Sequence, residues 1–272
     1  MPFMLIHPAA ALPLYHRLGR YGVLSALIIG SLTPDMHYFL PLAVSRDATH
    51  SVGGLVWFCW PVGIALYLLY HLLLKQPLAL LLPQAIATRV APWLKPGRLP
   101  EASWRAVLLS LLVGAVTHIA WDAFTHRHGP VVAALPVLHS VWFTLENYPL
   151  AGYAVLQQAS NVVGFALLGT WLWRWLRNQP PQPVAPIDSI LSAGQRGLIL
   201  GGVLIASAAF AAISIRSTPA APMELSALHN TFKQATLAAM SSGALVLLAY
   251  SLLWHIRARL RRVSPFNNEK IS

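Results

Sequence analysis

One stretch decides the fold of this chain: Thr117–His118–Ile119–Ala120–Trp121–Asp122–Ala123–Phe124–Thr125–His126, at the end of a long apolar run. It places His118, Asp122 and His126 four residues apart. On an α-helix four residues advance by about 400°, so the three side chains fall within an arc of about 80°. Each is costly inside a bilayer unless it is paired, hydrated or bound to an ion. Imidazole and carboxylate groups also bind Zn²⁺ and similar ions, so the stretch predicts a metal site or a proton path on a membrane helix.

The composition is that of an integral membrane protein. Of 272 residues, 56% are hydrophobic and only 10% are charged, and the mean hydropathy is +0.58. A soluble domain carries about 25% charged residues. The net charge of +11 would suggest nucleic acid in a soluble protein. Here the basic residues sit in short clusters between apolar runs, as topology determinants do, so we expect no nucleic-acid partner.

The lengths of the apolar runs predict an all-α fold, a polytopic membrane helix bundle of about five full spans plus an N-terminal short helical hairpin. Runs of roughly 20 residues, which are enough to cross a bilayer, lie at 53–74, 104–126, 153–175, 196–215 and 235–256. Two shorter runs, 8–18 and 22–33, flank a basic turn. They are too short for routine spans and predict the hairpin, with its turn at the membrane interface.

The hairpin brings further polar residues to one depth. His7 lies about 13 residues before the turn at Arg20, and Asp35 lies about 15 after it. At about 1.5 Å per residue both arms reach similarly far, so we expect His7 and Asp35 to meet at the open end. The sequence predicts a shared metal site near one face, with these candidate ligands: His7, Asp35, His50, His118, Asp122 and His126.

Charge predicts the orientation. Of the 19 Lys and Arg residues, 15 fall in the hairpin turn, 75–105, 174–196 and the C-terminal tail. The positive-inside rule then puts these segments, the basic tail included, in the cytoplasm of a multi-pass membrane protein. The candidate ligands lie toward the opposite face.

A Pro-rich connector, Asn178–Gln179–Pro180–Pro181–Gln182–Pro183, separates a His-rich first half from a plainer second half. We therefore expect four regions. They are a His/Asp-bearing membrane domain at 1–176, a Pro-rich linker at 177–195, two further membrane helices at 196–256 and a basic tail at 257–272.

Plainer interpretations remain open. A single interfacial histidine usually caps a helix or bonds a carbonyl, and His37, His128 and His139 are either support for the site or merely interfacial. The triplet on the helix is alternatively a structural polar network. The sequence has no Gly-rich phosphate loop, no serine elbow and no cysteine pair, since Cys59 is its one cysteine.

An ordered set of motifs resembles a known family. The motifs are Met1–Pro2–Phe3 with His7–Pro8–Ala9–Ala10, Gly30–Ser31–Leu32–Thr33–Pro34–Asp35, Thr49–His50–Ser51 and the stretch from His118 to His126. They are similar to those of a bacterial integral-membrane family described as a domain of unknown function (4184). The resemblance runs from residue 1 to about 176.

The same order of motifs resembles, more distantly, bacterial inner-membrane metal-dependent hydrolases and the zinc-dependent phospholipases C. That resemblance implies metal ligation by His7, Asp35, His50, His118 and Asp122, and implies a general-base role for Asp35. The soluble enzymes also need a His-x-x-x-Glu set, whereas His139 and Glu146 are seven residues apart here. We therefore expect one or two metal ions and not three.

The leading functional hypothesis is a metal-dependent hydrolase. A divalent ion, with Zn²⁺ as the first choice, is expected to activate water that attacks a lipid ester or another ester, with a phosphoester as the first choice, while Asp35 accepts the proton. The reaction is expected near the outer face of the bacterial inner membrane that the resemblance implies. His126 is expected to bind a second ion or to orient the leaving group. Two alternatives are a proton- or metal-coupled carrier and a membrane scaffold in which the metal only stabilises the fold.

Overall fold

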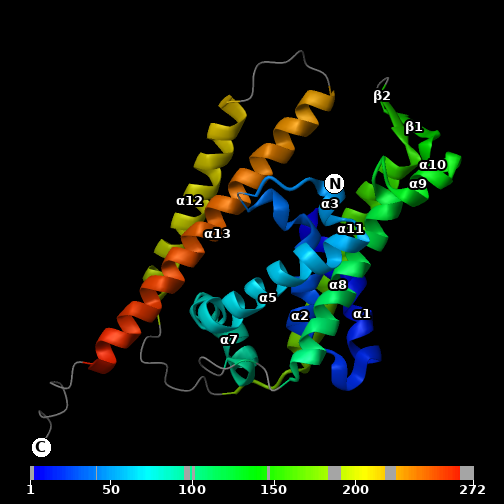
Figure 1. The fold of residues 1–272 in the computed structure, drawn as a ribbon. Helices are drawn as coiled ribbons and strands as arrows, with labels where there is room; N and C mark the ends of the chain where they lie inside the picture. Colours follow the sequence, from blue (N-terminus) through cyan, green and yellow to red (C-terminus); the bar gives the residue numbers. More distant parts are fainter. Residues whose placement is uncertain are drawn as a thin grey trace, which may run out of the picture. The chain divides into compact units, whose positions relative to one another are not determined.

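The protein is described by a computed structural model (Figure 1), which covers residues 3–40, 42–94, 99, 102–145, 148–182, 191–217 and 225–263. These residues are mostly helical, with a single two-stranded β-hairpin among them. The chain divides into two compact units, Met1–Leu68 with Leu99–Asn178, and Leu69–Arg98 with Gln179–Ser272.

Four helical stretches of the described chain are long and apolar enough to cross a membrane. They are Val52–Leu80, Trp104–Ala134, Ala193–Ser217 and Asn230–Leu260. The predicted all-α, polytopic class is therefore confirmed. The remaining predicted span lies within α11 (Gly152–Asn178), whose 27 residues are long enough. Polar residues in its first half, such as Gln157 and Asn161, make α11 less hydrophobic than the four candidate spans.

The first unit begins with the predicted hairpin. The 3₁₀ turn η1 (Met4–Ile6) leads into α1 (Pro8–Leu18), and a second turn, η2 (Gly19–Tyr21), connects it to α2 (Leu24–Gly30). Gly19 makes the reversal with φ +52°, a backbone conformation that residues with a side chain rarely adopt. The 3₁₀ helix η3 (Thr33–Tyr38) follows α2 directly.

The central helix of this unit is α8 (Trp104–Thr125). It begins where the Ser103 side chain accepts a hydrogen bond from the Ala106 N–H. It ends one residue earlier than the apolar pattern predicts, because His126 has extended backbone angles. The short helices α9 (Pro130–Ala134) and α10 (Pro136–His139) follow, each with a proline in its first turn.

Helices α2 and α8 approach unusually closely. A Cβ atom at Gly30 would lie 2.2 Å from the Leu111 carbonyl oxygen, and one at Gly114 would lie 2.3 Å from the Leu27 carbonyl oxygen. Small residues that let backbones touch are typical of helix pairs in membranes. Ser110, also on α8, accepts from the Val23 N–H at 2.9 Å. This contact fixes the start of α2 against the first half of α8.

The remaining elements of the first unit surround this pair. They are α3 (Arg46–Thr49), α4 (Val52–Gly54), the π-helical turn η4 (Leu55–Cys59), most of α5 (Trp60–Leu69), the hairpin strands β1 (Val141–Leu145) and β2 (Tyr148–Ala151), and α11. The strands pair antiparallel, with an irregularity between Val141 and Phe143. Trp60 donates its indole N–H to the Leu108 carbonyl at 3.2 Å, which holds α5 on α8.

The second unit contains a helical pair. Helices α12 (Ala193–Ser217) and α13 (Leu225–Val263) lie side by side, and Ser207 donates to the Ala239 carbonyl at 3.0 Å. The unit also holds η5 (Tyr70–Leu74), α6 (Lys75–Leu80), α7 (Gln84–Val90) and η6 (Ala91–Trp93). His255 of α13 bonds the Leu73 carbonyl at 3.0 Å. This bond agrees with the plain interpretation of an isolated interfacial histidine.

The predicted division into four regions is not tested by this arrangement. Much of the proposed linker, residues 183–190, and most of the basic tail, residues 264–272, lie outside the described residues. The segment 69–98 groups with the later helices and not with the His-bearing unit.

The close approach of α2 and α8 gives a stability prediction. We expect Gly114→Ala to lower the free energy of unfolding by about 1–3 kcal/mol, because the added methyl group overlaps the Leu27 carbonyl. Thermal unfolding of the purified protein in detergent measures this. The matched control is Gly169→Ala on α11, where an added Cβ meets nothing within 4 Å. A Gly114→Ala protein as stable as the control would contradict the packing described here.

Candidate metal centre

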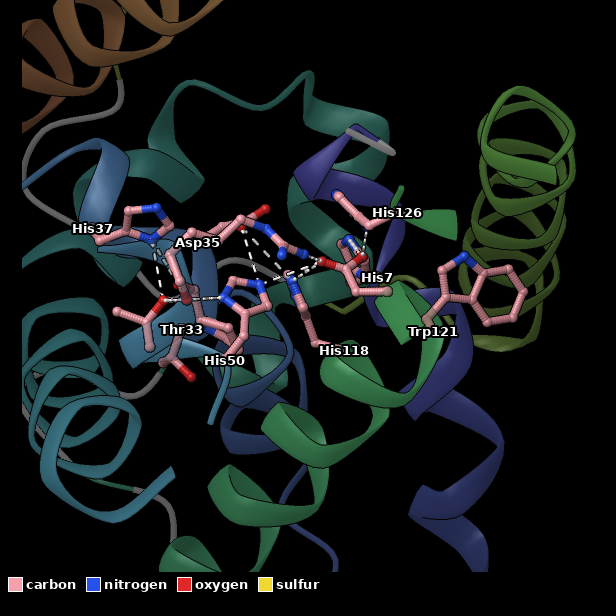
Figure 2. A network of polar contacts seen from close by, with 12 residues as sticks. His7, Thr33, Asp35, His37, His50, His118, Trp121 and His126 are labelled. Carbon is pink, nitrogen blue, oxygen red and sulfur yellow. Dashed lines mark hydrogen bonds and ion pairs between the residues drawn. The ribbon is translucent and has the colours of Figure 1, made fainter. Parts of the chain in front are cut away.

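Four side chains from three segments of the first unit converge at one end of α8 (Figure 2). Asp35 comes from η3, His50 from the residue after α3, and His118 and Asp122 from α8. One ligand atom from each residue can be chosen so that all four atoms lie within 4.8 Å of one another. The structure thus brings together four of the six predicted ligands as one group.

The spacing of these atoms fits a small cation. The Nε2 atom of His50 is 3.3 Å from Asp122 Oδ2 and 3.6 Å from Asp35 Oδ1. The Nε2 atom of His118 is 3.4 Å from Asp122 Oδ2 and 3.8 Å from Asp35 Oδ1. With bonds of about 2.0–2.1 Å, a tetrahedral Zn²⁺ ion separates its ligand atoms by about 3.3 Å. Small inward movements of these side chains would complete such a shell.

Hydrogen bonds orient both imidazole rings toward the centre. The Nδ1 atom of His118 is 2.7 Å from the Ser31 carbonyl oxygen, and that of His50 is 3.0 Å from the Arg46 carbonyl oxygen. A carbonyl only accepts, so each Nδ1 carries the donated proton and a neutral ring presents its lone pair at Nε2. Both Nε2 atoms are buried and have no hydrogen-bond partner among the described residues. This is the arrangement that metal-binding histidines adopt.

Burial makes the charges of the centre costly. Asp35 and Asp122 are only 1% and 3% exposed, and His118 is fully buried. Two carboxylates this close disfavour ionisation together unless a cation lies between them. Arg46 supplies one positive charge, since its Nη2 donates to Asp122 Oδ2 at 2.7 Å. One negative charge therefore remains uncompensated when the rings are neutral.

His7 and His126 lie at the other oxygen of Asp122. His126 Nδ1 is 3.3 Å from Oδ1, and His7 Nε2 is 3.7 Å from the same atom. The His7 ring also stacks on His118, with ring centroids 3.6 Å apart. The two predicted ligands are thus next to the four-membered group and outside it.

The state of the His7 ring is set by its surroundings. His7 lies before α1, outside the four spans, and is 2% exposed. Burial, together with the neighbouring His118, holds the pKa of His7 well below its usual value, so the ring is neutral at pH 7. A neutral imidazole is the form that binds a metal ion.

Local sequence explains how the loop residues reach the centre. Thr33 donates its hydroxyl to the Gly30 carbonyl at 2.7 Å, which turns the chain into η3 and leads it to Asp35. Ser45 caps α3 by accepting from the Ala48 N–H, so that the helix ends next to His50. The hairpin returns His7 to the same level as Asp35, since both contact residues of the α8 triplet.

The other histidines have supporting or unrelated places. His37 Nδ1 lies 2.9 Å from the Pro34 carbonyl oxygen and 3.4 Å from the Thr49 hydroxyl, so this ring braces the loop around His50. Burial lowers the pKa of His37, which keeps it neutral. The His139 ring makes an edge-to-face contact with the Tyr153 ring, and His139 is not part of the four-residue group. Glu146 lies outside the described residues.

The sequence interpretation missed Arg46 and Ser31. Arg46 is not among the predicted site residues, although its spacing of four from His50 in a Ser-capped turn places both on one helical face. Ser31 acts through its backbone carbonyl, which leaves no signal in side-chain chemistry. Its contact with His118 depends on the packing of α2 against α8.

Fold and site together define a polytopic helical membrane protein with a buried His/Asp cluster able to hold a metal ion. The chain belongs to the family described as domain of unknown function (DUF4184), whose model matches residues 1–252. No curated protein and no solved structure matches it.

The buried pair of carboxylates gives a prediction for metal-dependent stability. Zn²⁺ at about 100 times its dissociation constant should stabilise the purified protein by about 2.7 kcal/mol. We expect Asp35→Asn to lose most of this gain, because the amide gives the ion a weaker ligand and removes one charge. Thermal unfolding with and without Zn²⁺ measures the difference, and Asp47→Asn, at an exposed position on α3, is the control. Equal Zn²⁺-induced shifts in wild type and Asp35→Asn would count against Asp35 as a ligand.

Proposed function

We propose that this protein is a membrane-embedded hydrolase that uses a divalent metal ion, Zn²⁺ before others, to cleave a phosphoester or related ester of a lipid. The observation that carries the proposal is the set of two oriented Nε2 atoms and two buried carboxylates at 3.3–3.8 Å. The distant resemblance to metal-dependent hydrolases supports the reaction class only by analogy.

The distances favour different roles for the four side chains. His50 and His118 each lie closer to Asp122 than to Asp35. We assign His50, His118 and Asp122 as the three permanent ligands, since catalytic zinc sites use three protein ligands and keep a fourth position open. Asp35, whose oxygen lies farther from both imidazoles, would be the exchangeable fourth ligand. When water took its place at the ion, the Asp35 carboxylate would stand beside that water and could accept its proton.

A metal ion held by such a set polarises a phosphoryl or carbonyl oxygen and lowers the pKa of water. The protein supplies the remaining parts. Ser31 and Arg46, through their carbonyl oxygens, keep the imidazole lone pairs directed at the centre. His7 and His126 lie 3.7 and 3.3 Å from the second oxygen of Asp122, and both are placed to hold a proton or a second ion.

The location of the site suits a substrate that is part of the membrane. The cluster lies at the C-terminal end of the α8 span, one side chain from the exterior, because Arg46 is one quarter exposed and contacts Asp122. The charge distribution supports an inner-membrane protein with a cytoplasmic basic tail and the cluster near the outer face. Lipid headgroups at that face are the proposed substrates.

Metal content tests the first half of the proposal. Protein purified without chelator should contain close to one metal ion per chain by elemental analysis, about the amount expected of a single four-donor site. The double variant His118→Ala with Asp122→Ala should lose that metal, because it removes two of the ligands. His139→Ala, which lies outside the group, should keep it. Equal metal content in all three proteins would remove the proposed centre.

Turnover tests the second half. We expect metal-loaded protein to hydrolyse at least one member of a panel of phospholipids and lipid esters, and a chelator to abolish the activity. At a metal concentration that saturates the variant, Asp35→Asn should lower the rate about 10²- to 10⁴-fold, the usual contribution of a positioned base. Asp47→Asn again serves as the control. A metal-bound protein that turns over no substrate in the panel, or that moves labelled metal across vesicles, would overturn the hydrolase assignment.

A further inference from the structure

Arg46 has a place in the centre that the metal site itself does not require. Its guanidinium reaches Asp122 Oδ2 from the exposed side, while its backbone carbonyl orients His50. The side chain is 25% exposed, whereas the Asp122 side chain beside it is 4% exposed. Arg46 thus connects the buried cluster to the surface from which a substrate arrives.

The guanidinium retains unused hydrogen-bonding capacity. Arginine offers five N–H donors in a planar fork. The structure records one hydrogen bond for this side chain among the described residues, from Nη2 to Asp122. Its Nε is buried and has no hydrogen-bond partner there. A buried donor without a partner carries a desolvation cost that a ligand oxygen would remove.

The charge balance indicates what kind of ligand would do so. A divalent ion with the carboxylates of Asp35 and Asp122 has no net charge, and neutral imidazoles add none. Arg46 raises the charge of the occupied centre to about +1. That charge complements a phosphodiester monoanion and gives nothing to a neutral ester. Arginine forks match the oxygens of phosphoryl groups in geometry as well as charge.

We propose that Arg46 is a phosphoryl-binding residue that selects anionic phosphoesters over neutral esters at this centre. The inference rests on the proposed function, because it takes the metal centre as the place where the substrate binds. One nitrogen of the guanidinium keeps Asp122 in position, and the remaining N–H groups, Nε–H among them, bind a non-bridging phosphoryl oxygen. The ligand is either a phospholipid headgroup or a soluble phosphoester, since both present this group.

Phosphate binding to the Co²⁺-loaded, full-length protein tests this directly. Co²⁺ replaces Zn²⁺ in tetrahedral sites, and its visible absorption reports both occupancy and the arrival of an anion. We expect Arg46→Met to weaken inorganic phosphate binding by about tenfold or more, the effect of losing a charge-assisted hydrogen bond, while Co²⁺ content stays unchanged. The control is Arg127→Met, at an exposed residue of the same unit, which should change phosphate binding by less than about threefold.

Two further ligands distinguish the sources of the phosphoryl group. If Arg46 recognises the phosphoryl group itself, Arg46→Met should bind both glycerol 3-phosphate and a short-chain phosphatidylglycerol more weakly than the wild type does. Weaker binding of the lipid with unchanged binding of inorganic phosphate would overturn the proposal, because Arg46 would then recognise another part of the headgroup.

The outcomes also separate this inference from the metal site. If wild type binds no Co²⁺, the proposed function fails first. If it binds Co²⁺ and Arg46→Met binds phosphate as wild type does, only the role of Arg46 fails. Should Arg46→Met lose Co²⁺, Arg46→Lys decides: retained Co²⁺ with weakened phosphate binding supports the proposal. Loss of Co²⁺ in the lysine variant as well makes Arg46 a structural partner of Asp122 and overturns it.

Discussion

Two carboxylates buried within 4.8 Å of each other are the constraint that the first unit of this protein is built around. Negative charges this close repel and their burial is costly, so positive charge between Asp35 and Asp122 stabilises the pair. Arg46 provides one such charge, on one oxygen of Asp122. The Nδ1 atoms of His50 and His118 lie at carbonyl oxygens, so their Nε2 atoms face the same space, where a neutral ring presents a lone pair. This set of donors could hold a metal ion.

The packing of α2 against α8 determines where the site residues lie. Glycines at positions 30 and 114 let α2 and α8 touch through their backbones, and the chain leaving α2 therefore passes beside the last turns of α8. That path delivers the Ser31 carbonyl to His118 and, four residues later, Asp35 to the same ring. Contacts among residues that this packing brings together meet part of the cost of burying polar groups, as at His118 Nδ1 and Asp122 Oδ2.

The fold was largely predictable, and the site only in part. Run lengths predict the hairpin and the helices, since each element needs a set number of apolar residues, while Gln157 and Asn161 show why α11 is the least membrane-like of them. The pairing of His118 with Asp122 follows from helical spacing alone. The convergence of His50 and Asp35 on this pair depends on tertiary packing. The hairpin and the run lengths predict only that these residues share a face, and the family resemblance implies that they share a metal. His126 left the helical pattern because the helix ends at Thr125, and Ser31 acts through its backbone, which no residue type reveals.

X-ray absorption at the zinc edge of the purified protein tests the central claim most directly. The account predicts a Zn²⁺ ion with only nitrogen and oxygen neighbours at about 2.0–2.2 Å and the outer-shell scattering of two imidazoles. A sulfur neighbour, or a spectrum without imidazole scattering, would place any bound metal elsewhere and contradict a centre made by His50, His118, Asp122 and Asp35.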